Sequence, residues 1–296
     1  MRPPTGPTII DHLFGLPFLT VRWYGVLIVT GAILAGVLAA RRARARGIDG
    51  EHVWSQLLLG MILGIIGARL YYVAFEWDRY AGRPLLEIVN PQGGGLAIHG
   101  AIAGAALAAL IYTRRHRLPL LTWLDICMPA LLAGQAIRRW GNFFNQEAYG
   151  RPTTLPWGLD IPPDRRIPPY DNLAQYPRST RFHPTFLYES LWDAAALLLI
   201  LGIERRFRGW LRPSDSALLY GVLYSAGRFV TEGLRTDSLC VGAYTLDGSC
   251  AGGLRIAQLV SLAALVICGL VLAWRHRPGT GGMRPLPPAV DLSGRE

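Results

Sequence analysis

Residues 120–150 join the apolar run LLTWLDICMPALLAGQAI directly to the polar segment RRWGNFFNQEAYG. The apolar part, 120–137, is long enough to cross a hydrocarbon core of about 30 Å as a helix. The polar part, 138–150, contains two arginines, two asparagines, a glutamine and a glutamate. Polar groups at the edge of a bilayer are costly to bury and are usually functional. This stretch therefore predicts a membrane protein whose chemistry lies at one end of a span.

The composition of the whole chain agrees with a membrane protein. The 296 residues are 51% hydrophobic and only 17% charged, with a net charge of +10. An excess of basic residues is also found in nucleic-acid-binding proteins, but here the arginines bracket apolar runs, which is typical of bilayer proteins. We therefore do not expect a nucleic-acid partner.

The apolar runs predict an all-α integral membrane protein with about seven transmembrane helices. The expected spans are 23–40, 53–75, 97–113, 120–137, 185–202, 216–230 and 256–274. The third is rich in glycine and alanine, which favours close helix packing. The fourth is the weakest prediction because Asp125 and Pro129 interrupt it.

Arginine clusters at 41–46, 114–117, 205–212 and 275–277 follow alternate spans. The positive-inside rule places these clusters in the cytoplasm, with the N-terminus outside and the C-terminus inside. We therefore expect a multi-pass membrane protein whose polar segment 138–150 faces the extracytoplasmic side.

The domain organisation follows from these spans. Residues 1–277 are expected to form one polytopic catalytic domain, and the Gly- and Pro-rich tail 278–296 to be disordered. Within the domain, the proline-rich segment 138–184 predicts a small irregular extracytoplasmic cap, with short strands as one possibility. Cys240 and Cys250 share one polar loop, and a disulfide between them is left open, because it requires an extracytoplasmic loop.

Ionisable groups converge on the expected outer leaflet from several helix ends. Taken singly, each has a structural explanation: His99 as an interfacial histidine, Arg228 with Glu232 as an ion pair, tyrosines as an aromatic belt, Arg69 as a snorkelling side chain. Their convergence instead favours a site for an anionic head group, because guanidinium groups match phosphate oxygens. The groups concerned are Tyr24, His99, Arg138, Arg139, Asn142, Asn145, Glu147, His183, Tyr188, Glu189, Tyr224, Arg228, Glu232 and Arg235.

The run RRWGNFFNQEAYG closely resembles the signature of the bacterial prolipoprotein diacylglyceryl transferases. The resemblance also covers WYG at 23–25, GAR at 67–69, HG at 99–100, HPTFLYE at 183–189 and YxxxRFxxE with its following arginine at 224–235. It therefore extends over most of the chain. Two departures are Arg138, where the family has a small residue, and Ala101, where it has a second glycine.

The resemblance implies an enzyme that moves the diacylglyceryl group of phosphatidylglycerol onto the lipobox cysteine thiol of a preprolipoprotein. The product is a thioether, and glycerol phosphate is released. The implied location is the bacterial cytoplasmic (inner) membrane, with the active site toward the extracytoplasmic face. The implied partners are phosphatidylglycerol, preprolipoprotein signal peptides and the bilayer. We expect a monomer that needs no cofactor or metal.

The sequence suggests a role for each candidate residue. His99 is the expected base for the thiol, with Glu147 as the alternative, and Arg139 and Arg228 are the expected phosphate clamp. Substrate binding is assigned to Tyr24, Arg69, Asn142, Asn145, Glu147, Gly150, Tyr188, Tyr224, Glu232 and Arg235. The competing interpretations are a transporter or flippase for an anionic lipid or solute, in which no bond is broken, and a structural scaffold.

Overall fold

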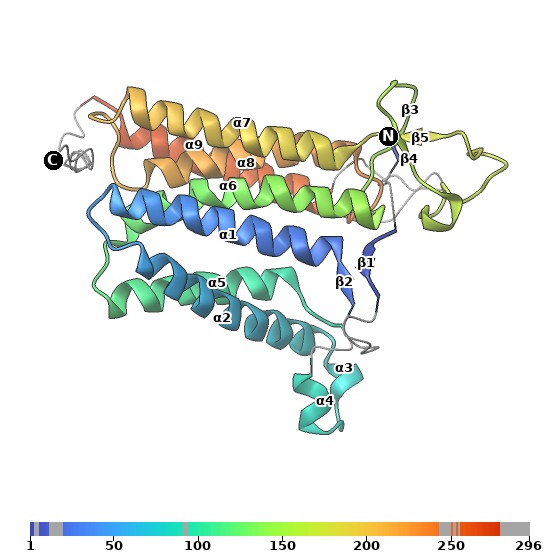
Figure 1. Cartoon of the computed structure of the whole chain (residues 1–296), viewed down its shortest axis with the longest axis horizontal. Coiled ribbons are helices and arrows are strands. Elements are labelled where there is room, and N and C mark those ends of the chain that lie inside the picture. Colours follow the sequence, from blue (N-terminus) through green and yellow to red (C-terminus); the bar gives the residue numbers. More distant parts are fainter. Residues whose placement is uncertain are drawn as a thin grey trace. The chain divides into compact units, whose positions relative to one another are not determined.

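The computed structural model describes residues 1–2, 6–11, 20–90, 94–242, 250, 253 and 255–278, so the prediction for the tail beyond residue 278 lies outside the described residues. A long helix forms at each of the seven apolar runs (Figure 1). These helices are α1 (Trp23–Arg44), α2 (Glu51–Phe75), α5 (Ile98–Arg115), α6 (Leu120–Asn145), α7 (Thr185–Arg206), α8 (Asp215–Leu234) and α9 (Ile256–Arg275).

Helix α6 is longer than the sequence suggested. It passes through Pro129 without a break and continues eight residues beyond the expected end at Ile137, as far as Asn145. Gln146 follows with a φ of 58°, a left-handed conformation that stops the helix. The first half of the polar segment is therefore helical, and Arg139 and Asn142, three residues apart, share one face.

The described chain divides into two compact units, each containing part of α1 and part of α6. The second unit consists of Gly36–Ile126 and contains α2, α5 and the short helices α3 (Trp77–Tyr80) and α4 (Leu85–Val89). Helices α2 and α5 pack closely through glycines: a Cβ added to Gly100 would lie 2.1 Å from the carbonyl oxygen of Gly67. This contact confirms the close packing expected of the third apolar run.

The first unit contains the described residues of 1–35 and 127–278. Helices α6, α7, α8 and α9 form a bundle within it (Figure 1). Leu132 on α6 and Ala196 and Ile200 on α7 are buried together, and Leu219 and Leu223 on α8 pack against them. Because α6, α7 and α8 follow one another and are joined in an up-down-up order, the end of α6, the start of α7 and the end of α8 meet at the same end of the bundle (Figure 1).

The segment between α6 and α7 contains the short strands β3 (Pro152–Thr153), β4 (Leu159–Asp160) and β5 (Arg181–Phe182) and a 3₁₀ turn at Pro163–Arg165. The strands form an antiparallel sheet in the order β3-β5-β4. Its aromatic core includes Tyr149, Phe182 and Phe186. Arg166, 6% exposed, holds the remaining loop by donating hydrogen bonds to the carbonyls of Ile161, Tyr176, Pro177, Arg178 and Thr180. The short strands raised as a possibility for this segment are therefore present.

A further antiparallel pair, β1 (Thr8–Ile10) with β2 (Val21–Arg22), precedes α1. Among the described residues, α1, α2, α6, α7 and α9 are long and apolar enough to cross a membrane. These helices support a multi-pass integral membrane protein. Helices α5 and α8 do not meet the same standard, and in α8 the reason is a stripe of polar side chains.

Candidate functional site

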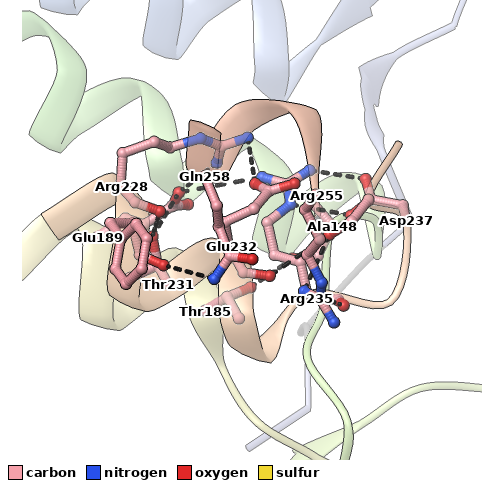
Figure 2. Close-up of polar contacts among 12 residues, drawn as sticks. Ala148, Thr185, Glu189, Arg228, Thr231, Glu232, Arg235, Asp237, Arg255 and Gln258 are labelled. Atoms are coloured by element: carbon pink, nitrogen blue, oxygen red, sulfur yellow. Dashed lines mark hydrogen bonds and ion pairs between the residues drawn. The ribbon is translucent and has the colours of Figure 1, made fainter. Parts of the chain in front are cut away.

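Glu189, in the first turns of α7 and 4% exposed, lies between arginines of two other helices. Its Oε2 is 3.0 Å from Nη1 of Arg139 on α6. Its Oε1 accepts a hydrogen bond of 2.9 Å from Nη1 of Arg228 on α8, which Figure 2 shows. One buried carboxylate therefore brings together the two arginines that the sequence proposed as a phosphate clamp.

The polar stripe of α8 supports Arg228 from its other side. Arg228 Nη2 is 2.6 Å from Oε2 of Glu232, one helical turn further on. Arg235 follows at the end of α8, with Nη1 3.9 Å from Oε1 of Glu189 and two hydrogen bonds to Asp237, of 2.9 and 2.6 Å (Figure 2). The predicted group Arg228, Glu232 and Arg235 therefore forms a continuous ion-pair network centred on Glu189.

Both arginines of the clamp keep donors that no described residue accepts. A guanidinium group has five N–H donors. Within the described part of the chain, Arg139 forms one ion pair, with Glu189, and its buried Nε has no hydrogen-bond partner. Arg228 uses Nη1 and Nη2 on the two glutamates, and its side chain is 21% exposed. A buried donor without an acceptor is costly, so the site is suited to an incoming anion.

Gly150, the last residue of the signature, lies where the chain after α6 meets the start of α7 and the end of α8 in the first unit. It forms a β-bridge with Arg235, and its N–H donates to the carbonyl of His183 at 2.9 Å. A Cβ on Gly150 would lie 2.8 Å from the Cβ of His183 and 3.1 Å from the carbonyl oxygen of Leu234. The absence of a side chain at this position therefore lets the chain after α6 join the start of α7 to the end of α8.

The other polar residues of the signature lie around the end of α6. Asn142 is 5% exposed, and its carbonyl accepts the N–H of Glu147 at 3.1 Å. Asn145 Nδ2 donates to Oε1 of Glu147 at 3.2 Å. Tyr24, on the first turn of α1, packs against Gly141, where an added Cβ would lie 2.5 Å from its ring. Tyr24 is thereby held next to the turn that carries Arg139 and Asn142.

The two remaining tyrosines differ in their surroundings. The hydroxyl of Tyr188 is 3.2 Å from Nδ1 of His183 and accepts a hydrogen bond of 3.2 Å from Nε1 of Trp157. Burial lowers the pKa of His183, so its imidazole is neutral at pH 7 and able to accept from Tyr188. Tyr224 stacks on Tyr220, with ring centroids 5.6 Å apart.

His99 and Arg69 belong to the second unit and are not among the contacts of the arginine network. His99 is exposed in the first turn of α5, with its ring centroid 5.8 Å from that of Tyr71. Arg69 is buried in α2 and donates to the carbonyls of Glu87, Ile88, Gly94 and Gly95. These bonds give Arg69 a structural role, because they hold the segment that leads into α5.

The sequence reasoning placed Glu189 among the polar groups but gave it no role, and it missed Asp193 entirely. Both are buried in α7, four residues apart and hence on one face. Two acidic residues at that spacing inside an apolar helix are a signal that the sequence already contained. They mark the face of α7 that meets the arginines.

Comparison with known proteins agrees with the resemblance over almost the whole chain. The family model described as prolipoprotein diacylglyceryl transferase matches residues 11–275. A Chloroflexus aggregans protein named phosphatidylglycerol–prolipoprotein diacylglyceryl transferase is 53% identical, over 99% of this chain and 97% of its own length. Proteins of the same name from Gloeobacter violaceus and Synechococcus elongatus are 46% and 45% identical, over 92% and 96% of this chain and 93% and 91% of their own lengths. The chain therefore belongs to the prolipoprotein diacylglyceryl transferase family.

Proposed function

We propose that this protein transfers the diacylglyceryl group of phosphatidylglycerol to the lipobox cysteine thiol of preprolipoproteins, releasing glycerol phosphate. Family membership supports the reaction. The structural observation that supports it is the pair Arg139 and Arg228, held on the two oxygens of Glu189 with donors to spare. An anion that accepts from both arginines matches the phosphodiester of the lipid.

The reaction places charge where these arginines lie. The thiol loses its proton, its sulfur bonds to the glycerol carbon that carries the phosphate ester, and the C–O bond breaks. The electron pair of that bond goes to the phosphate oxygen, so negative charge grows on the leaving glycerol phosphate. Arg139 and Arg228 stabilise this charge, and each such donor in a dry site is typically worth about 10²–10³ in rate.

Glu189 acts as a positioning residue in this proposal. Its carboxylate fixes both guanidinium groups before the lipid binds, so little reorganisation is needed during the reaction. Glu232 and Arg235 hold Arg228 and Glu189 in the same way from α8. Tyr24, Asn142, Asn145, Tyr188 and Tyr224 contact the head group around this centre.

The base for the thiol is assigned to His99. A free thiol with a pKa of about 8.5 is mostly protonated at pH 7, so a base is worth about 10²–10⁴-fold. The exposed imidazole of His99 is accessible to a substrate peptide. Glu147 remains the alternative, although its carboxylate already accepts a hydrogen bond from Asn145.

The proposed protein is a monomer of the cytoplasmic membrane with seven spans, an outside N-terminus and a cytoplasmic C-terminus. The part of the expected 138–184 cap that follows α6, residues 146–184, covers the outer face. Cys240 and Cys250, in the connection from α8 to α9, form a disulfide, which favours an oxidising compartment at that end of α8. Arg228, Glu232 and Arg235 lie toward the same end of α8, so the site is extracytoplasmic. The arginines after α1, α5, α7 and α9 then lie inside.

The test uses purified protein in phosphatidylglycerol liposomes with a lipobox peptide. Mass spectrometry measures the diacylglyceryl thioether, and a separate assay measures released glycerol phosphate. Arg139→Gln and Arg228→Gln are expected to lose about 10²–10³ in rate, whereas Arg165→Gln, an exposed arginine paired with Asp164, serves as the matched control. Lipid movement across the bilayer without either product would favour the transporter instead.

A further inference from the structure

A second layer of polar side chains lies one helical turn from the Glu189 network, deeper in the same bundle. Gln135 precedes Arg139 by four residues on α6, and Asp193 follows Glu189 by four residues on α7. Because α6 and α7 run in opposite directions, both steps move the same way along the bundle, by about 6 Å. Tyr220 on α8 reaches this depth too, because its hydroxyl accepts a hydrogen bond of 3.1 Å from Nε2 of Gln135.

This layer contains buried polar atoms that no described residue satisfies. Asp193 is 3% exposed, and its Oδ2 has no hydrogen-bond partner. Gln135 donates to Tyr220, but its Oε1 is buried without a donor, and Nε of Arg139 is buried without an acceptor. The charge of Asp193 interacts with Arg139 and with Tyr220, which places the three side chains near one another. Two acceptors, Asp193 Oδ2 and Gln135 Oε1, and one donor, Arg139 Nε, therefore lack hydrogen-bond partners in the same region of the bundle.

Buried polar atoms are normally hydrogen-bonded, so a missing partner points to a ligand or a trapped water. The set of open atoms defines the chemistry of the ligand. It must donate twice, to a carboxylate and an amide oxygen, and accept once from a guanidinium N–H. Two neighbouring hydroxyl groups do this. An ammonium group satisfies the acceptors, but it cannot accept from Arg139 and is repelled by its charge.

We propose that Gln135, Arg139 and Asp193 form a polyol subsite that binds the glycerol hydroxyls of the lipid head group. The two hydroxyls donate to Asp193 Oδ2 and Gln135 Oε1, and one of their oxygens accepts from Arg139 Nε. This proposal rests on the proposed function, since the phosphate held between Arg139 and Arg228 carries that glycerol into reach. Asp193 and Gln135 thus determine specificity, because they select a head group with free hydroxyls.

The experiment compares three lipids that differ only in the head group. They are phosphatidylglycerol, phosphatidyl-1,3-propanediol, which lacks the secondary hydroxyl, and phosphatidyl-1-propanol, which lacks both. The readout is kcat/KM for thioether formation on one lipobox peptide. Each lost hydroxyl is expected to lower kcat/KM of the unmodified protein by about 10- to 100-fold, since a hydrogen bond to a buried polar or charged group is lost.

The variants are Asp193→Leu and Gln135→Leu, which remove the acceptors. In each, the preference for phosphatidylglycerol over phosphatidyl-1-propanol is expected to fall by about 10- to 100-fold. Asp193→Asn, which keeps one acceptor oxygen, is expected to lose less of the preference. Glu204→Gln, near the other end of α7 and bonded to Ser216, is the matched control that retains the full preference.

The ratio of the kcat/KM values for two lipids is measured on the same active molecules, so partial misfolding of a variant does not change this ratio. Equal use of phosphatidylglycerol and phosphatidyl-1-propanol by the unmodified protein would overturn the subsite and indicate a layer filled by water only. Variants that slow both lipids by the same factor would overturn it too, because Asp193 would then be structural. Absence of any thioether from phosphatidylglycerol would instead refute the proposed function.

Discussion

Arg139 on α6 and Arg228 on α8 bind opposite oxygens of one buried carboxylate, that of Glu189 on α7, at 3.0 and 2.9 Å. Three helices are thereby joined at a single charged point inside an otherwise apolar bundle. A buried ion network of this kind adds little to stability compared with a hydrophobic core, but removing one partner leaves an uncompensated charge. The network instead fixes the positions of two guanidinium groups before the lipid binds.

Replacing the central acid should damage both the fold and the reaction. Glu189→Gln removes the charge shared by Arg139 and Arg228 and is expected to lower the stability by about 3–5 kcal/mol. The rate of thioether formation should fall about 10²–10³-fold, because the donors are no longer preorganised. Phosphatidylglycerol should raise the Tm of this variant more than that of the unmodified protein, since the phosphate supplies the missing anion. Glu87→Gln, an exposed partner of Arg83, is the control, and an equal lipid effect in all three proteins would contradict the positioning role.

We predict that a lysine at position 228 cannot perform the function of Arg228. The guanidinium group reaches Glu189 through Nη1 and Glu232 through Nη2 at the same time, whereas an ammonium group is a single point charge. We expect Arg228→Lys to lower kcat/KM for phosphatidylglycerol by about 10- to 100-fold even though the charge is kept. The comparison is Arg83→Lys in the exposed pair with Glu87, which should retain full activity. Full activity of Arg228→Lys would show that charge alone is sufficient.

The packing of Tyr24 against Gly141 predicts a steric effect. In Gly141→Ala the new methyl group would lie 2.5 Å from the Tyr24 ring, so the ring or α1 must move. The expected loss of stability is about 1–3 kcal/mol, and the activity should fall with it because Tyr24 leaves the turn that carries Arg139. Gly202→Ala in α7, where nothing lies within 4 Å of the new Cβ, should instead be neutral or stabilising. Thermal unfolding of both variants, with the thioether assay, measures the difference.

His183 predicts a pH dependence of stability. Burial lowers its pKa in the folded protein below the unfolded value of about 6.5, so the unfolded chain binds the proton more readily. The contribution of His183 to the free energy of unfolding is therefore fully retained above about pH 6.5. It is lost progressively as the pH falls from there toward the pKa of His183 in the folded protein. Tm measured from pH 5 to 8 should fall less steeply on acidification in His183→Gln than in the unmodified protein. Identical slopes of Tm against pH in the two proteins would exclude His183 as the source of the pH dependence.

The disulfide provides a test of orientation. Cys240 and Cys250 are bonded to each other in a disulfide, whereas the other two cysteines, Cys127 and Cys268, lie within α6 and α9. If the connection from α8 to α9 is extracytoplasmic, a membrane-impermeant maleimide should label these two cysteines in spheroplasts only after reduction by a membrane-impermeant reductant. A protein carrying Cys240→Ser and Cys250→Ser is the control for background labelling. Labelling that requires permeabilisation of the membrane would contradict the proposed topology.

The sequence predicted the long helices well because their signal is local. Each apolar run is long enough to be recognised alone. All seven formed helices, and six of them lie within four residues of the expected bounds. The end of α6 was placed too early because a polar composition was taken as the end of the helix. No proline follows Pro129 before Asn145, so nothing in the backbone stops the helix there.

The choice of Arg139 and Arg228 was also possible from the sequence, since arginines at the ends of apolar runs are conspicuous and match the family signature. What the sequence by itself determined is the set of helices and the polar residues on each helical face. Only the tertiary structure decided that Glu189 joins the two arginines, that Arg69 bonds to backbone carbonyls, and that Gln135 on α6 bonds to Tyr220 on α8. The physical reason is that these contacts join residues far apart in the chain, and the packing of one helix against another sets their partners.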